Sequence, residues 1–126
     1  MIYLDTNYLI RGLVPKSQES LAILTWISEG QLFATSSISW YEFLCGPVSE
    51  KDILLIQTLL GPRVIAFNEA HASAASRLFN GVHRQRNLKV DTMIAAVAIV
   101  EDYLLATANL QDFKNFVPFG LRLHGY

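Results

Sequence analysis

The sequence predicts an α/β fold, built as a short, mostly parallel sheet with helices on both faces. Short apolar runs alternate with longer segments of helical character, a pattern typical of parallel strands joined by helices. No internal repeat, low-complexity tract or linker interrupts this alternation. At 126 residues the chain is expected to form one domain, residues 1–126, with a core large enough to fold independently.

Strands are expected where short apolar runs meet turn-forming residues. Five such runs occur, at residues 2–5, 32–35, 63–67, 103–107 and 119–123. The first ends in an acidic residue, Asp5, and the third follows the turn Gly61-Pro62.

Helices are expected between these strands because the intervening segments carry capping residues and helical periodicity. They are predicted over residues 7–12, 17–29, 38–45, 50–60, 68–85 and 91–101, with a turn or short helix at 109–116. Ser17 and Asp91 are expected to act as N-caps. In the helix at 17–29, Leu21, Leu24 and Ile27 are expected to form the face that packs on the core.

Composition excludes several classes of protein. Apolar residues make up 52% of the chain, yet no run approaches the ~20 residues of a membrane span. The N-terminal apolar run is short and follows no basic residue, so a secretory signal is not expected. The only cysteine, Cys45, excludes an internal disulfide and favours a cytoplasmic location. A net charge of −1 does not suggest a bulk nucleic-acid binder, although a local basic patch would suffice.

Acidic and amide residues follow two of the predicted strands. Asp5 follows the first strand, and Asn109 and Asp112 follow the strand at 103–107. Ligands of open α/β sheets bind just beyond the carboxyl ends of the strands, so these residues are candidates for a site. Ordinary turn chemistry is the alternative interpretation for each of them.

Two further acids stand in apolar surroundings. Glu42 lies within Trp40-Tyr41-Glu42-Phe43-Leu44, and Asp91 heads a helix that is apolar on almost every side. A solvated helix position for Glu42 and a capping role for Asp91 are the plain alternatives. Acidic side chains are seldom buried unless they are paired, which favours a functional role.

Carboxylates packed together would repel one another and raise their pKa values. A hard divalent cation, Mg²⁺ or Mn²⁺, relieves this repulsion and prefers oxygen ligands. No histidine or cysteine pair has the spacing of a zinc site, and the histidines are interpreted as ordinary surface or helix residues: His71, His83 and His124.

Four stretches occur in a characteristic order and spacing: Ile2-Tyr3-Leu4-Asp5-Thr6-Asn7, Ser39-Trp40-Tyr41-Glu42, Val90-Asp91-Thr92-Met93-Ile94-Ala95-Ala96 and Leu105-Ala106-Thr107-Ala108-Asn109-Leu110-Gln111-Asp112-Phe113. Together they resemble the PIN domain, and in particular the small VapC-type toxin ribonucleases. The resemblance covers essentially the whole chain and implies a PIN-like three-layer sandwich.

The resemblance also implies a metal-dependent endoribonuclease that hydrolyses RNA phosphodiester bonds and uses Mg²⁺, for which Mn²⁺ can substitute. Asp5 and Asp91 would bind the metal directly, and Glu42 would bind it directly or through water. The fourth acidic position of the family holds Asn109 here, where many members carry Asp. Asn109 can still offer a carbonyl oxygen or orient a water, and Asp112 is a further candidate metal ligand that would supply the missing charge. The four catalytic candidates are Asp5, Glu42, Asp91 and Asn109.

Substrate contacts are expected from two regions. By the same resemblance, Thr6 and Asn7 would form hydrogen bonds to a ligand or to the phosphate. From Ala70 to Val90 the chain carries no acid but several bases, namely Arg77, Arg84, Arg86 and Lys89. Such residues would neutralise RNA phosphates, although cations near a helix C-terminus also complement its dipole.

Family members form homodimers and are silenced by an antitoxin protein, so the resemblance implies both kinds of partner. A haloacid-dehalogenase-type phosphatase is disfavoured because position 7 is Asn rather than Asp. A receiver-like domain is disfavoured because no acidic pair follows the first strand. A PIN-fold protein that binds RNA or a partner without cutting, weakened at Asn109, remains the alternative, and a cleavage assay separates the two.

Overall fold

A computed structural model describes the whole chain, from Met1 to Tyr126. Its centre is a five-stranded sheet in the order β3-β2-β1-β4-β5, and every neighbouring pair is parallel. The strands are β1 (Ile2–Leu4), β2 (Phe33–Ser36), β3 (Val64–Ile65), β4 (Leu104–Ala106) and β5 (Arg122–Leu123). The predicted α/β fold is therefore confirmed, and no strand runs against the others.

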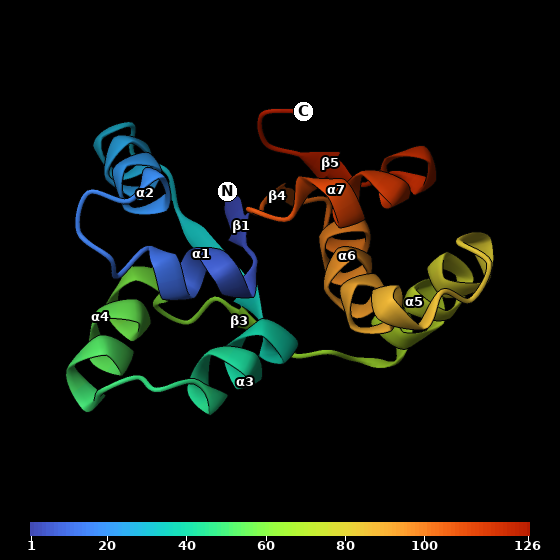
Figure 1. The fold of residues 1–126 in the computed structure, drawn as a ribbon, viewed down its shortest axis with the longest axis horizontal. Helices are drawn as coiled ribbons and strands as arrows, with labels where there is room; N and C mark the ends of the chain where they lie inside the picture. Colours follow the sequence, from blue (N-terminus) through green and yellow to red (C-terminus); the bar gives the residue numbers. More distant parts are fainter.

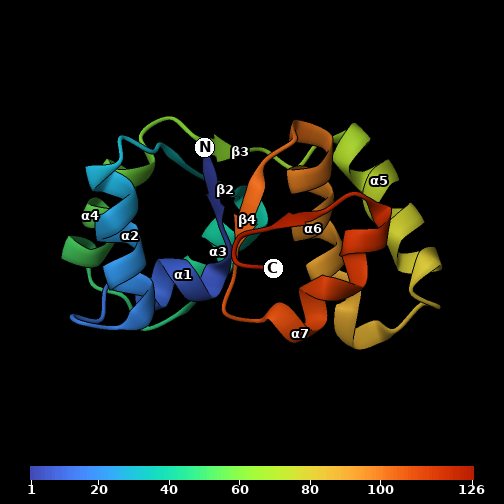
Figure 2. The same cartoon turned by 90° about the horizontal axis from the view of Figure 1, so that it is seen from above.

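Helices cover both faces of the sheet, which gives three layers (Figures 1 and 2). On one side lie α1, α2 and α4, and on the other lie α5 and α6. The helices are α1 (Thr6–Arg11), α2 (Gln18–Ser28), α3 (Ser37–Cys45), α4 (Glu50–Leu60), α5 (Glu69–Gly81), α6 (Lys89–Glu101) and α7 (Leu110–Phe113), with short 3-10 helices η1 (Arg86–Leu88) and η2 (Lys114–Phe119). None of them combines the length and apolar composition needed to cross a bilayer.

The sheet separates two hydrophobic cores because side chains alternate along each strand. In β1, Ile2 and Leu4 pack in the core beneath α1, α2 and α4, whereas Tyr3 belongs to the core shared with α5 and α6. The Tyr3 hydroxyl donates a hydrogen bond to the carbonyl oxygen of Ile94 in α6 at 3.0 Å. This bond ties the central strand to the helix that carries Asp91.

Several boundaries differ from the prediction. The strand expected at 63–67 forms only at Val64–Ile65, and α5 ends at Gly81 rather than near residue 85. His83 and Arg84 adopt left-handed backbone angles, with φ of 61° and 56°, and so turn the chain away from the helix axis. Because neither residue is a glycine, the sequence gives no sign of this turn.

The predicted orientation of α2 is wrong. Leu21, Leu24 and Ile27 are 53%, 61% and 49% exposed, whereas Ile23 and Trp26 are buried. The Trp26 ring stacks on Tyr8 and packs against Phe33, and this packing fixes which side of α2 faces the sheet. Apolar residues occur on both sides of this helix, so periodicity alone could not choose between them.

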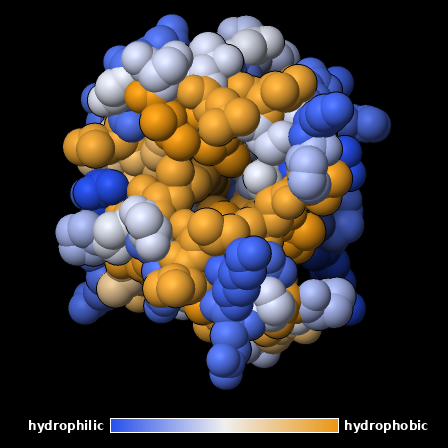
Figure 3. All heavy atoms as spheres, turned by 90° about the vertical axis from the view of Figure 1, so that its left-hand side faces the viewer, coloured by the Kyte–Doolittle hydropathy of each residue, from blue (hydrophilic) through white to orange (hydrophobic).

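An exposed apolar face results on the outer side of the α1–α4 half. It includes Leu21, Leu24 and Ile27 of α2 together with Leu54 and Leu55 of α4, and we call it the apolar side face. Figure 3 views the molecule from this side and shows apolar atoms gathered around a hollow. Large contiguous apolar patches on soluble proteins mark interaction surfaces.

Two leucine substitutions test this orientation. Leu105→Ala in β4 removes a fully buried side chain and is expected to lower the free energy of unfolding by about 3 kcal/mol. Leu24→Ala removes an exposed one, and its effect is expected to stay within about 0.5 kcal/mol. Urea denaturation of both variants measures the difference, and a Leu24→Ala cost similar to that of Leu105→Ala would show that α2 faces the other way.

Candidate active site

The candidate site lies where the chain leaves two neighbouring strands in different directions. After β1 it enters α1 on one side of the sheet, and after β4 it continues toward α7. Asp5 follows β1 and Thr107 follows β4. The two strand ends are fixed side by side because the Asp5 amide donates a hydrogen bond to the Ala106 carbonyl oxygen at 3.1 Å.

Asp5 is buried, and three donors face its carboxylate. The side chain is the N-cap of α1, accepting a hydrogen bond from the Thr6 amide at 2.8 Å. Its second oxygen, Oδ2, accepts from the Thr107 hydroxyl at 2.8 Å and from the Asn7 side-chain amide at 3.1 Å. Both carboxylate oxygens thus have fixed directions before any ligand binds.

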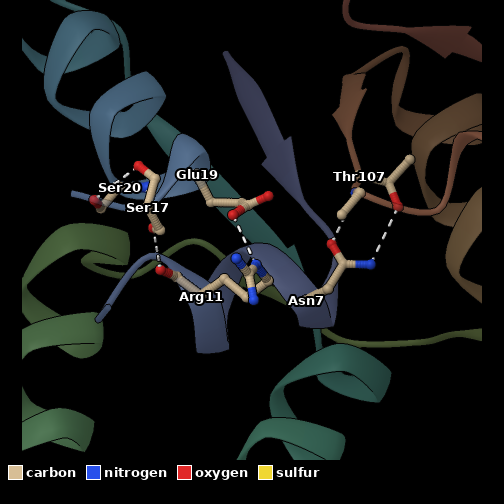
Figure 4. A network of polar contacts seen from close by, with 7 residues as sticks. Asn7, Arg11, Ser17, Glu19, Ser20 and Thr107 are labelled. Atoms are coloured by element: carbon tan, nitrogen blue, oxygen red, sulfur yellow. Dashed lines mark hydrogen bonds and ion pairs between the residues drawn. The ribbon is translucent and has the colours of Figure 1, made fainter. Parts of the chain in front are cut away.

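Thr107 joins the two strand ends, and the sequence analysis gave it no role of its own. Its hydroxyl oxygen also accepts a hydrogen bond from the Asn109 amide at 3.0 Å. Asn7 closes the junction, because its side-chain oxygen accepts from the Ala108 amide at 3.0 Å (Figure 4). The signal that could have identified Thr107 is its position, directly after a strand that pairs with β1.

Glu42 comes from α3, which Ser36 caps by accepting a hydrogen bond from the Ser39 amide at 3.0 Å. The Thr6 hydroxyl donates to Glu42 Oε1 at 2.7 Å, so Thr6 connects Glu42 to Asp5 through its hydroxyl and its backbone amide. One turn earlier in α3, the hydroxyl of Ser39 is buried without a hydrogen-bond partner.

Asp91 lies in the first turn of α6, but it is not the N-cap that the sequence analysis expected. The helix begins at Lys89 behind the 3-10 helix η1, and Leu88 occupies the capping position without a side-chain hydrogen bond. Asp91 is half-buried, and its negative charge lies at the positive end of the helix dipole.

The charges of Asp5, Glu42 and Asp112 all act on Asp91. Burial raises the pKa of Asp91 to about 7, and the charges of Asp5, Asp112 and Glu42 add to the shift. Burial also raises the pKa of Asp5, with the charge of Glu42 acting in the same direction against the hydrogen bonds from Thr107, Thr6 and Asn7. Residues from four separate segments therefore form one acidic cluster.

Asn109 and Asp112 act as a pair. The Asn109 side-chain amide donates a hydrogen bond to Asp112 Oδ2 at 3.0 Å, and both residues are half-buried. The charge of Asp112 reaches Asp91, as its contribution to the raised pKa of Asp91 shows. The neutral residue thus holds an acid beside the cluster.

The atoms of the cluster that could bind a metal are carboxylate, amide and hydroxyl oxygens, which suit a hard divalent cation such as Mg²⁺. No three histidine, cysteine, aspartate or glutamate side chains stand in a ready-made metal-binding arrangement. Mg²⁺ usually keeps several waters and takes only one or two carboxylates directly, so such a complete cage is not required. A bound cation would relieve the repulsion from Asp5, Asp112 and Glu42 that adds to the effect of burial on the pKa of Asp91.

The predicted substrate-binding residues fall into two groups. Arg84, Arg86 and Lys89 line one surface hollow of about 600 Å³ together with Phe79, at the end of the molecule where α6 begins. Arg77 lines a different cavity. Thr6 and Asn7 stand inside the cluster, with side-chain donors directed at Glu42, Asp5 and Thr107.

The remaining residues singled out from the sequence are structural in character. His71 is fully buried, and its two ring nitrogens contact the Asn68 amide and Glu101 at 3.1 Å and 2.9 Å. Phe43 is buried in the core and Trp40 stacks on it, with 5.4 Å between ring centroids. Both rings therefore pack against the core, whereas Tyr41 between them in the sequence is exposed.

The raised pKa of Asp91 predicts a specific pH dependence. Because its pKa rises from 3.8 to about 7 on folding, the folded state binds the extra proton between these values. The free energy of unfolding of the metal-free protein should therefore fall as the pH rises from about 4 to 7. Because Asp91 is only half-buried, solvent screens part of this effect, and the free energy of unfolding is expected to fall by about 1–2 kcal/mol.

Thermal unfolding between pH 4 and 8 measures this effect. Asp91→Asn should raise Tm at pH 7.5 without metal and should reduce the further rise that Mg²⁺ gives to the wild type. Asp102→Asn, which removes an exposed charge at the other end of α6, is the matched control. If the dependence of Tm on pH were the same in Asp91→Asn as in the wild type, Asp91 would not be the group that causes it.

The PIN domain family matches residues 2–116. Among solved structures, this chain is similar to VapBC2 from Rickettsia felis bound to a DNA fragment from their promoter. The TM-score is 0.75 and the sequence identity 23%, and the match covers 100% of this chain and 99% of that one. FitAcB from Neisseria gonorrhoeae gives a TM-score of 0.75 at 22% identity, covering 99% of this chain and 97% of that one. VapBC-1 from nontypeable Haemophilus influenzae gives a TM-score of 0.71 at 24% identity, covering 98% of this chain and 97% of that one.

A comparison with curated proteins gives no match. These similarities cover nearly the whole of each pair of compared chains, and at such low sequence identities they indicate a shared fold only. The family match covers most of the chain, and the resemblance found in the four sequence stretches is confirmed. The chain belongs to the PIN domain family.

Proposed function

We propose that this protein is a metal-dependent endoribonuclease that hydrolyses RNA phosphodiester bonds and serves as the toxin of a toxin–antitoxin pair. The observation that carries the proposal is the convergence of Asp5, Glu42, Asp91 and Asp112 where β1 and β4 end. The pKa of Asp91 is raised mainly by burial, and the charges of Asp5, Asp112 and Glu42 raise it further.

In this proposal, Asp5 and Asp91 bind Mg²⁺ or Mn²⁺, and Glu42 completes the ligand set directly or through water. When bound, the cation neutralises charge on the phosphate and makes water more nucleophilic. The carboxylates of the cluster accept the proton that this water loses. Thr107 and Asn7 hold Asp5 in place, and Thr6 aligns Glu42 with it, so both carboxylates are oriented before substrate arrives.

Asn109 contributes through its partner Asp112. It holds that carboxylate at 3.0 Å and leaves its own side-chain oxygen free to orient a water or bind the cation. The alternative proposal, an RNA- or partner-binding protein with weakened catalysis, rests on this same neutral residue.

RNA approaches along the hollow formed by Arg84, Arg86 and Lys89. Contacts from these side chains to phosphates are independent of sequence and weaken as salt increases. They position the strand beside α6, where Asp91 lies two residues beyond Lys89.

A cognate antitoxin is the expected partner, because the similar solved structures include VapBC complexes of two proteins. The apolar side face supports this proposal, since it exposes leucines of both α2 and α4 (Figure 3). A homodimer and a cytoplasmic location remain part of the proposal.

Cleavage of RNA by the purified protein tests the nuclease activity. With Mn²⁺ or Mg²⁺ the wild type should cut single-stranded RNA, and EDTA should abolish the reaction. Loss of an outer partner of a metal ligand alone costs roughly 10- to 100-fold. Asp5→Asn and Asp91→Ala, which remove proposed direct ligands, should therefore each reduce the rate by about 100-fold or more.

Expression in a bacterial host gives the matching cellular result. Wild-type protein should arrest growth, whereas Asp91→Ala should not, and Asp102→Asn should behave as the wild type does. RNA that is bound but never cut, with growth unaffected, would favour the catalytically weakened alternative.

The antitoxin is tested through the apolar side face. A small open reading frame beside this gene should encode a protein that co-purifies with the chain and relieves growth arrest. Leu24→Glu combined with Leu54→Glu should abolish co-purification, since both side chains are exposed on this face. Val100→Glu, at another exposed apolar position on α6, should leave co-purification intact; the reverse pattern would place the partner elsewhere.

A further inference from the structure

A second cavity adjoins the acidic cluster on the α2 side. It has a volume of about 410 Å³, within the range of roughly 300–1,000 Å³ of small-molecule sites. Its lining joins α1, α2, the segment after β4 and the C-terminal residues, and includes Tyr8, Glu19, Trp26, Thr107, Ala108 and His124. The proposed chemistry uses none of this space.

The cavity shares a wall with the active site. Thr107 lines it and also donates to Asp5 at 2.8 Å, while the amide of Ala108 donates to Asn7 at 3.0 Å. A group in this cavity is therefore separated from the acidic cluster by a single layer of side chains, the Asn7–Thr107 junction of Figure 4. A nucleotide whose base occupied this cavity would therefore hold its phosphate next to the acidic cluster.

Aromatic rings form one side of the cavity. Trp26 and Tyr8 stack with 5.9 Å between centroids, and His124 meets Trp26 edge-on at 4.7 Å. Trp26 itself is buried, whereas His124 is exposed and Tyr8 is half-buried, so these two rings offer surface to a ligand. Unstacked RNA bases bind to such aromatic surfaces.

Glu19 supplies a hydrogen-bond acceptor in the same cavity. It is only 6% exposed, and its Oε1 accepts a hydrogen bond from Arg11 Nε at 2.8 Å. This bond lowers the pKa of Glu19, so the side chain stays ionised and cannot donate. The other oxygen, Oε2, accepts no hydrogen bond within the chain and points away from Arg11 in Figure 4.

The ion pair with Arg11 also selects the kind of ligand. Because Arg11 already balances the charge of Glu19, a second cation, such as an arginine from a partner protein, would find no unpaired charge. A neutral ligand that carries an N–H donor and a flat ring satisfies both the free oxygen and the aromatic wall.

We propose that this cavity binds one unstacked base of the RNA substrate, beside the scissile phosphate, and reads it through a hydrogen bond from its Watson–Crick edge to Glu19. Guanine suits it better than uracil because guanine presents N1–H and N2–H₂ donors side by side, whereas uracil presents a single N–H between two acceptors. The inference rests on the proposed function, since it names a base within the RNA that the site would cut.

Nucleotide binding without metal tests the cavity independently of catalysis. In ¹⁵N-labelled protein, 5′-GMP should shift the indole signal of Trp26 and leave that of Trp40 unchanged, with at least a 5-fold lower Kd than 5′-UMP. Glu19→Gln should remove this difference. Glu29→Gln, the same change at the exposed end of α2, should retain it.

A second variant guards against misfolding of Glu19→Gln. His124→Ala changes an exposed residue and should weaken binding of both nucleotides by a similar factor, of about 5-fold or more, through lost stacking. Equal Kd values for the two nucleotides in the wild type would overturn the proposal. So would an indole shift caused by arginine amide but by neither nucleotide.

Cleavage of RNAs that differ at one position next to the cut provides the second readout. A preference for guanine that Glu19→Gln abolishes and Glu29→Gln retains supports the proposal. Nucleotide binding that discriminates bases in a protein that cuts no RNA would overturn the nuclease function and leave the base pocket standing.

Discussion

The buried carboxylate of Asp5 is the group on which the arrangement of the site depends. A charge removed from water must be met by hydrogen bonds, and its donors come from two ends of the chain: Thr6 and Asn7 from α1, and Thr107 from the end of β4. Because β1 and β4 are paired in the sheet, these donors reach the carboxylate without distorting the backbone. The same contacts fix the entry of α1, the direction of the segment toward α7, and the shared wall with the cavity of Glu19 and His124.

The acidic cluster sets function against stability. Carboxylates held together in a half-buried site destabilise the folded state once they ionise, and the pKa of Asp91, about 7, places that change near neutral pH. Two features reduce the cost. Asp91 lies in the first turn of α6, where the helix dipole favours negative charge, and Asp5 is held by three donors. In the proposed metal-bound form, a divalent cation would relieve the repulsion that remains, so the property that makes the metal-free protein less stable at neutral pH would also favour cation binding.

Features of the sequence that act locally predicted the structure well. Apolar runs bounded by turns located all five strands. Asp5 and Asp112 were found because strand ends are where α/β sites form, and Glu42 and Asp91 because acids in apolar surroundings are unusual. The errors arose where long-range packing decides the outcome. Leu21 and Leu24 face outward because Trp26 occupies the inner side of α2, and Asp91 is not a cap because η1 starts the helix two residues earlier. Thr107 escaped notice because its role exists only through Asp5, about a hundred residues away.

Asn109 shows how a departure from the family pattern can keep the electrostatics of a site. Two carboxylates at the 3.0 Å separation found between Asn109 and Asp112 would repel, and one would stay protonated or move away. The amide instead donates to Asp112 and holds its charge where it still raises the pKa of Asp91. Asp112, three positions further along the chain in α7, brings the number of acids in the cluster to four. A neutral residue at this position is therefore compatible with a metal-dependent site, provided that Asp112 accompanies it.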